Sequence, residues 1–164
     1  MENKNNSYLT FYIGGEIFAA SVTKVLSILE MEPITKVPLA PDYLLGVINL
    51  RGSILPIIDS KIKFGMPIDN NVKNPFIVVM EVFIDETNVQ IGVLVDSVSE
   101  VIEVEPKNIL PPPSIGTKYK AEFITGVFTL NDNSFAMLLD VDKAFASDEI
   151  LSINNDNQNI ELNN

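Results

Sequence analysis

The stretch Gly46-Val47-Ile48-Asn49-Leu50-Arg51-Gly52-Ser53-Ile54-Leu55-Pro56-Ile57-Ile58-Asp59 decides the fold of this chain. Two aliphatic runs flank the polar segment Arg51-Gly52-Ser53, whose glycine suits a tight turn. Short aliphatic runs on either side of such a segment are typical of a β-hairpin. Pro56 has no backbone N–H to give to a neighbouring strand, so it predicts an edge or a bulge. The stretch therefore predicts two antiparallel strands with Arg51 at their tip.

Three further hairpins are predicted by the same kind of pattern, and strands dominate the chain. They are residues 9–13 with 17–19 around Gly14-Gly15, Phe76–Ile84 with Val89–Val95, and Val127–Thr129 with Phe135–Leu139. Helical signals are limited to single turns, at Ser21–Val25, Pro41–Leu45 and Asp96–Ser99. Many short strands separated by Gly, Pro and Asn turns indicate an all-β sandwich or small barrels.

The chain also carries a faint internal repeat. Glu16–Pro38 aligns with Val89–Pro111, and this alignment matches Val25 with Val98 and Pro33 with Pro106. Further along, Gly46 aligns with Gly126 and Asp59 with Asp140. Polar and proline positions match as well as aliphatic ones, which favours two related modules over a chance alignment.

The repeat divides the chain into modules at roughly residues 8–64 and 76–146 of one domain spanning 8–146, with strand exchange between the modules allowed for. Two small barrels that share one core fit this duplication better than a single ligand-holding barrel. Residues 1–7 and 147–164 are polar and Asn-rich, and we expect flexible tails there, the second one starting with a frayed helical turn.

Composition excludes several classes of function. The 164 residues contain no Cys and no His, which removes disulfides, thiol nucleophiles, imidazole chemistry and the usual zinc ligands. A formal net charge of -11 disfavours binding to nucleic acid or to anionic membrane surfaces. No run approaches the about 20 apolar residues that span a bilayer, and Met1–Ser7 is too polar for a secretion signal. A cytoplasmic protein without metal or cofactor is the expectation, since phosphate-binding glycine loops are also missing.

Carboxylates are the one catalytic group in good supply. Glu30 and Glu32, like Glu103 and Glu105, project from one face of a strand, so a two-carboxylate hydrolase stays open, although a solvated outer face is favoured. Asp59 and Asp140 stand at equivalent strand ends, where we expect them to cap the following turn rather than to bind a cation.

Arg51 is the single arginine of the chain. A guanidinium at a hairpin tip suits docking to a carboxylate or to backbone carbonyls of a partner. Position alone leaves an incidental surface charge as the alternative.

The opening stretch resembles the signature of CheW-like coupling proteins, G-x-x-N-x-R-G-x-I-x-P-V-I-D. The resemblance runs from Leu9-Thr10-Phe11 through residues 91–96 to Leu138-Leu139-Asp140. It implies a CheW-like domain over residues 8–146, with an all-β fold of two intertwined five-stranded SH3-like barrels and short helical turns.

The resemblance also implies a function. CheW-like coupling proteins are cytoplasmic, non-enzymatic scaffolds that link chemoreceptor signalling tips to the regulatory domain of a chemotaxis histidine kinase in membrane-associated arrays. The family's receptor contacts fall on Val22, Val25, Gly46 and Arg51, with Ser27 where the family often has Glu. Ser27 would leave Arg51 without its usual intramolecular partner, unless Glu30 replaces it.

The kinase contacts are not assigned to residues. Because the kinase regulatory domain carries its own CheW-like module, the resemblance implies pseudo-symmetric end-to-end packing through aliphatic strand edges. Other readings stay open: an adaptor of a non-flagellar chemosensory pathway, an isolated kinase-type module, the carboxylate-dependent hydrolase, and a small-ligand binder that uses a barrel cavity.

Overall fold

The computed structural model describes residues 6–67, 72–112, 121–146, 150 and 153. The first half of the chain forms β1 (Ser7–Ile13), β2 (Glu16–Ser21), β3 (Val25–Glu30), β4 (Leu44–Leu50) and β5 (Ser53–Asp59). The second half forms β6 (Phe76–Ile84), β7 (Thr87–Val95), β8 (Ser97–Glu103), β9 (Ile124–Thr129) and β10 (Phe135–Leu139). The short helices are η2 (Val22–Lys24), α1 (Ser60–Lys63), η3 (Pro106–Asn108), η4 (Ala121–Phe123) and α2 (Val141–Phe145). None of these helices is long and apolar enough to cross a bilayer.

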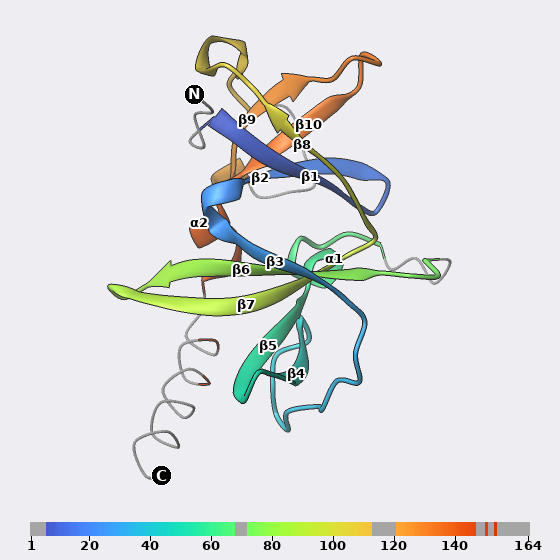
Figure 1. Cartoon of the computed structure of the whole chain (residues 1–164), viewed down its shortest axis with the longest axis vertical. Coiled ribbons are helices and arrows are strands. Elements are labelled where there is room, and N and C mark those ends of the chain that lie inside the picture. Colours follow the sequence, from blue (N-terminus) through green and yellow to red (C-terminus); the bar gives the residue numbers. More distant parts are fainter. Residues whose placement is uncertain (1–5, 68–71, 113–120, 147–149, 151–152, 154–164) are drawn as a thin grey trace.

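The strands form two five-stranded sheets, and each sheet mixes strands from both halves of the chain (Figure 1). The upper sheet in Figure 1 has the order β8-β1-β2-β10-β9, and the lower sheet has the order β3-β6-β7-β5-β4. Exchanging β1–β5 with β6–β10, strand for strand, converts one order into the other. The expected all-β fold of two five-stranded SH3-like units is confirmed.

Neither sheet closes into a complete barrel by strand pairing. A two-bond bridge joins Thr35, after β3, to Val47 of β4, with N–H to O distances of 2.9 and 2.8 Å. The equivalent bridge joins Leu110, after β8, to Val127 of β9 at 2.8 and 2.9 Å. Each sheet therefore curls until its two edge strands approach, and a seam is left open beside the bridge.

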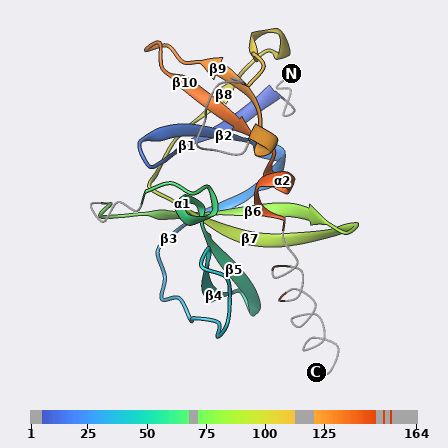
Figure 2. The same ribbon diagram turned by 180° about the vertical axis from the view of Figure 1, so that it is seen from behind.

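The two sheets share a central hydrophobic core. Phe11 and Phe18 from the upper sheet meet Met80 and Ile91 from the lower sheet in one buried cluster. Aromatic rings from the short helical turns extend it, and the rings of Phe64 and Phe123 stack at 4.6 Å between centroids. Figure 2 shows α1 and α2 at the junction of the sheets. Each sheet also encloses a small cluster of its own, built around Phe128 in the upper sheet and Ile57 in the lower sheet.

Two of the three predicted helical turns are wrong. Residues 97–103 form strand β8, because Val98 and Val101 pair with β1 and gain more from the ladder than one helical turn provides. Pro41–Leu45 forms a turn that leads into β4 at Leu44. The expected capping is confirmed: Asp59 accepts from the N–H of Lys61 at 2.9 Å, and Asp140 accepts from the N–H of Lys143 at 3.1 Å.

The core extends beyond the domain boundary expected at residue 146. Ile150 is fully buried in the central cluster, and Ile153 packs against the same cluster. The two side chains are spaced as neighbours on one helical face. At the other end, the expected flexible tail of residues 1–7 is too long, because Ser7 begins β1 and Asn6 accepts from the Val104 N–H at 2.8 Å. The rest of the predicted tails, residues 1–5 and most of 147–164, lies outside the described residues.

Candidate functional site

The tip of the β4–β5 hairpin presents Arg51 from an unusual backbone conformation. Leu50 pairs with Ser53, and Arg51 and Gly52 have φ values of 53° and 85°. Positive φ at both central residues defines a type I′ turn, which matches the twist of the flanking strands but favours Asn and Gly. The Asn49 side chain accepts from the Gly52 N–H at 2.9 Å and steadies the turn. The geometry thus projects the Arg51 side chain into solvent.

Arg51 forms no ion pair within the part of the chain that the structure describes. The expected loss of a partner at Ser27 agrees with this, and Glu30 does not take its place there. The guanidinium keeps its donors available for a partner molecule, where they match a carboxylate or backbone carbonyls.

Strand β3 forms one edge of the lower sheet, next to the open seam beside the Thr35–Val47 bridge. Its pairing with β6 slips between Val25 and Ser27, so that Leu26 forms a bulge. Val25, Ser27 and Leu29 are half-buried, whereas Leu26 and Ile28 point outward with 45% and 44% of their surface exposed. An edge strand with aliphatic side chains on its solvent face is typical of a surface that binds another protein.

The structure brings the five predicted receptor-contact residues to the two edges of the lower sheet. Val22 lies in η2 immediately before β3, Val25 and Ser27 lie on β3, Gly46 on β4, and Arg51 at the hairpin tip. Because β3 and β4 are the two edge strands, the seam runs between them.

Gly46 differs from the other four because it is buried. A Cβ there would collide with the carbonyl oxygen of Thr35 and approach a methyl group of Ile34 at 2.6 Å. Its φ of 150° is also rare for residues with a side chain. Gly46 therefore allows the Thr35–Val47 bridge that sets the width of the seam.

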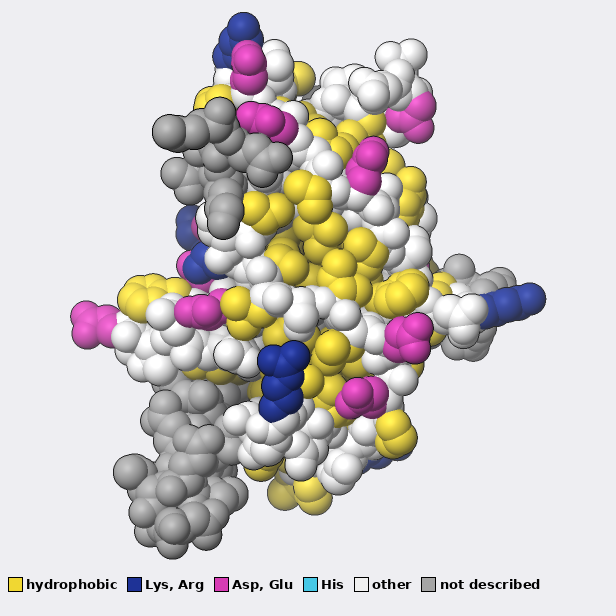
Figure 3. Space-filling model, viewed as in Figure 1, with side chains coloured by type: hydrophobic (Ala, Val, Ile, Leu, Met, Phe, Trp, Pro, Cys, Tyr) yellow, Lys and Arg dark blue, Asp and Glu magenta, His cyan; other side chains and the backbone are white. Residues whose placement is uncertain are grey.

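Leu26 and Ile28 are exposed residues of the seam that sequence reasoning missed. Figure 3 shows hydrophobic side chains gathered over the middle of one face, in the region where β3 and β8 cross it in Figure 1. Acidic side chains lie around the margin of this area. The available signal was the run Val25-Leu26-Ser27-Ile28-Leu29, in which a strand with a single buried face cannot hide every aliphatic side chain.

Two curled β-sheets that expose aliphatic edge strands beside a solvent-facing arginine define a protein-docking scaffold. The CheW-like domain family matches residues 7–149, and the chain belongs to this family. Similar proteins include the chemotaxis protein CheW of Rhizobium meliloti (strain 1021), 33% identical over 91% of this chain and 93% of that protein. The chemotaxis protein CheW of Klebsiella aerogenes is 30% identical over 94% of this chain and 90% of its own.

A solved structure agrees with these relatives. The crystal structure of the scaffolding protein TtCheW from Thermoanaerobacter tengcongensis superposes with a TM-score of 0.76 at 28% identity, over 90% of this chain and 92% of that one. The chain is a scaffold of chemotaxis signalling, as the resemblance of its hairpin motif implies.

Proposed function

We propose that this chain is a non-enzymatic, cytoplasmic adaptor that joins the tips of chemoreceptors to a chemotaxis histidine kinase in membrane-associated arrays. The observation that carries the proposal is the seam of the lower sheet. One of its edge strands, β3, exposes aliphatic side chains, and the other, β4, leads to Arg51, which has no ion-pair partner among the described residues. A surface of this kind holds a partner by apolar contact and selects it by a few polar groups.

The proposed receptor site contains Val22, Val25, Ser27 and Arg51 as contacts, with Gly46 setting the shape of the seam. To these residues we add Leu26 and Ile28, whose exposed side chains offer more apolar area than the half-buried valines. An apolar surface of this kind suits an amphipathic helix, which docks through residues on one face.

The decisive test is Arg51→Glu, with receptor-tip binding measured by titration. Reversal of a charge at a hairpin tip leaves the core intact, so the fold should survive while receptor affinity falls about tenfold or more. Lys143→Glu is the matched control, because it makes the same change at an exposed position on α2. Unchanged receptor affinity of the Arg51→Glu protein would remove Arg51 from the site.

Coupling would then be tested directly. The chain, a receptor signalling tip and the cognate kinase are mixed, and kinase autophosphorylation is compared with and without the chain. An adaptor changes the kinase rate only when all three proteins are present, because its effect is to bring the other two together. Turnover of a substrate by the purified chain alone would contradict a non-enzymatic role.

We also infer that residues 8–64 and 76–146 are duplicated modules. Strand register supports this: Ile57 lies opposite Gly92 in the lower sheet, and Leu138 lies opposite Ala19 in the upper sheet. The alignment that matches Asp59 with Asp140 also matches Ile57 with Leu138, and the alignment that matches Val25 with Val98 also matches Ala19 with Gly92. The two parallel strand pairs therefore join equivalent positions.

The duplication supports end-to-end packing with the CheW-like module of the kinase. Ile54 and Phe135 occupy equivalent positions at the starts of β5 and β10, and both remain exposed. One hairpin end can therefore meet the equivalent end of a related module. Cross-links from Ile54 or Phe135 to the kinase are the expected result, and contacts found solely in residues 147–164 would contradict it.

A further inference from the structure

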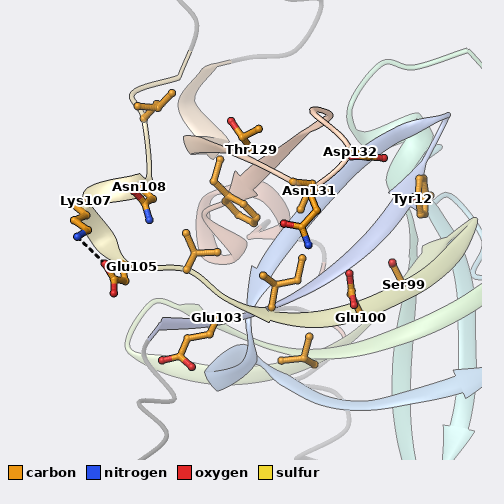
Figure 4. A pocket seen from close by; sticks show the side chains of 16 residues that line it. Tyr12, Ser99, Glu100, Glu103, Glu105, Lys107, Asn108, Thr129, Asn131 and Asp132 are labelled. Atoms are coloured by element: carbon orange, nitrogen blue, oxygen red, sulfur yellow. Dashed lines mark ion pairs between the residues drawn. The ribbon is translucent and has the colours of Figure 1, made fainter.

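A groove of about 990 Å³ lies at the seam of the upper sheet, between β8 and the β9–β10 hairpin. Its floor includes Phe128, which belongs to the hydrophobic cluster inside that sheet, and its walls include Val101 and Leu110, which are 60% and 52% exposed. Figure 4 shows Glu105 and Lys107 at one end of the groove and Tyr12 and Asp132 at the other. The groove thus exposes apolar side chains on its walls, above a buried ring that belongs to the sheet interior.

This groove is the internal counterpart of the proposed receptor site. The alignment that relates the two modules places Ser27 over Glu100, Gly46 over Gly126 and Arg51 over Asn131. Glu100 and Asn131 line the groove, and Gly126 makes the close approach to Ile109 that Gly46 makes to Ile34. The same architecture is therefore present twice, once in each sheet.

The two seams differ in charge. The lower seam offers Arg51, whereas the upper groove is lined by Glu100, Glu103, Glu105 and Asp132, and Lys107 is the single basic residue among the described residues that line it. That lysine already pairs with Glu105 at 3.2 Å. The hydroxyl of Ser134 donates to Asp132 and lowers the pKa of that carboxyl, which favours its ionised form. A partner that fits here carries positive charge.

The backbone of the groove favours an extended partner. β8 is an edge strand, paired with β1 on one side and facing the groove on the other. Residues 99–104 line the groove in sequence, and six extended residues span about 20 Å. Thr10 fixes a bulge at Glu100, donating to its carbonyl at 2.8 Å and accepting from its N–H at 3.2 Å. The regular edge left for pairing is Val101–Glu103.

We propose that this groove is a second docking site, for an extended segment of a partner protein in which aliphatic residues alternate with lysine or arginine. The aliphatic side chains cover Val101 and Leu110, and the basic ones meet Glu100 and Asp132. The proposal goes beyond the adaptor function and does not depend on it, because it uses none of the proposed receptor contacts. A scaffold whose two seams differ in charge selects two different partners without competition between them.

The test uses the full chain, labelled with ¹⁵N, and three seven-residue peptides capped at both ends. Their sequences are Lys-Val-Lys-Ile-Lys-Val-Lys, the same peptide with Glu for Lys, and the block-order peptide Lys-Lys-Lys-Lys-Val-Ile-Val. The alternating Lys peptide should shift the amides of residues 101–104 and 128–132 and bind about fivefold or more tightly than either control at low salt.

Variants separate the groove from the overall negative charge of the chain. The double variant Glu100→Gln with Asp132→Asn should lower the affinity for the alternating Lys peptide by about three- to tenfold. The control Glu122→Gln, which removes an exposed carboxylate outside the groove, should leave that affinity unchanged. Arg51→Glu should leave this binding unchanged, so that failure here and failure of the receptor site are distinguishable.

Three outcomes would overturn the proposal. Shifts scattered over the acidic surface, equal for the block-order peptide, would show attraction to net charge only. Shifts at Leu26–Ile28 would move the binding to the lower seam. Groove amides that shift on concentrating the chain without peptide would assign the groove to a second copy of the chain.

Discussion

Arg51 adopts a left-handed backbone conformation that side chains other than Asn, Asp and Gly take up at a cost in free energy. We expect Arg51→Asn to raise the free energy of unfolding by about 0.5 kcal/mol, because Asn tolerates the type I′ turn better. Urea denaturation measures this change. The same variant should bind a receptor tip more weakly, and a variant that gains affinity or loses stability would contradict the proposed role.

Two glycines of the same hairpin make a matched pair. A Cβ at Gly46 meets Thr35 and Ile34, whereas a Cβ at Gly52 has no atom within 4 Å. Gly46→Ala should therefore destabilise the fold by about 3 kcal/mol and Gly52→Ala by about 1 kcal/mol, since both positions have positive φ but one of them also has a steric clash. Thermal unfolding would compare them, and equal losses would show that φ alone matters.

At the level of elements, two ion pairs tie the short helices α1 and α2 to equivalent parts of the fold. Helix α1 supplies the lysine of its pair, whereas α2 supplies the carboxylate of its pair. Asp96, between β7 and β8, binds Lys61 of α1 at 2.7 Å and accepts from the Gly14 N–H at 2.8 Å. In the other half the carboxylate belongs to helix α2: Asp142 binds Lys24 of η2 at 3.0 Å and accepts from the Phe83 N–H at 2.8 Å. The connection is the same in both modules, but the residues that supply it are not.

The two ion pairs should differ in their contribution to stability. The side chains of Lys61 and Asp96 are 10% and 19% exposed, against 32% and 34% for Lys24 and Asp142. Asp96→Asn should cost about 3 kcal/mol, because it leaves a buried lysine unpaired. Lys24→Gln should cost about 0.5 kcal/mol, as for an exposed pair. Urea titrations would decide, and a larger loss for Lys24→Gln would refute the dependence on burial.

Strands could be predicted from the sequence where an apolar run ends at turn-forming polar residues, as in Phe76–Ile84 before Asp85-Glu86, which forms β6 with those bounds. The prediction failed at Asp96–Ser99, because a local helical signal competed with a ladder to β1 that is distant in sequence. Pro56 shows the same dependence on distant residues. It lies in β5 and pairs with Val47 of β4, and the parallel pairing of β5 with β7 begins one residue later, at Ile57. Strand β5 is therefore not an edge strand, but at Pro56 itself its side toward β7 is not yet paired.

The candidate site was partly predictable. The hairpin motif pointed to Gly46 and Arg51 because their spacing is specific. Leu26 and Ile28 were missed because the bulge in β3 decides which side chains face solvent. The upper groove was missed because its walls come from β8 and the β9–β10 hairpin, whose approach depends on how far the sheet curls.

At the level of the whole molecule, neither half of the chain contains a complete sheet. β1 and β2 pair with β8 and β10, and β3 and β5 pair with β6 and β7. Residues 1–67 and 72–164, produced separately, should therefore each be unfolded by circular dichroism and should regain strand structure when mixed. A half that folds alone as a monomer would contradict the exchange of strands between modules.

Net charge acts on the whole fold. With a formal charge of -11 at pH 7, self-repulsion opposes the compact state. Raising NaCl from about 10 to 300 mM should increase the Tm by about 3 °C through screening. Near pH 4.3, the isoelectric point, the same salt step should have little effect, and an equal rise there would point to a cause other than charge.

The exchange of strands has a consequence for synthesis on the ribosome. The hairpin of β1 and β2 leaves the exit tunnel first, but its neighbour β10 begins at Phe135. At about 5–20 residues per second, the nascent hairpin waits on the order of ten seconds with its apolar face uncovered. Until β10 arrives, that hairpin depends on shelter by chaperones, and a shortage of general chaperones should reduce the yield of this chain before that of proteins whose sheets form in chain order.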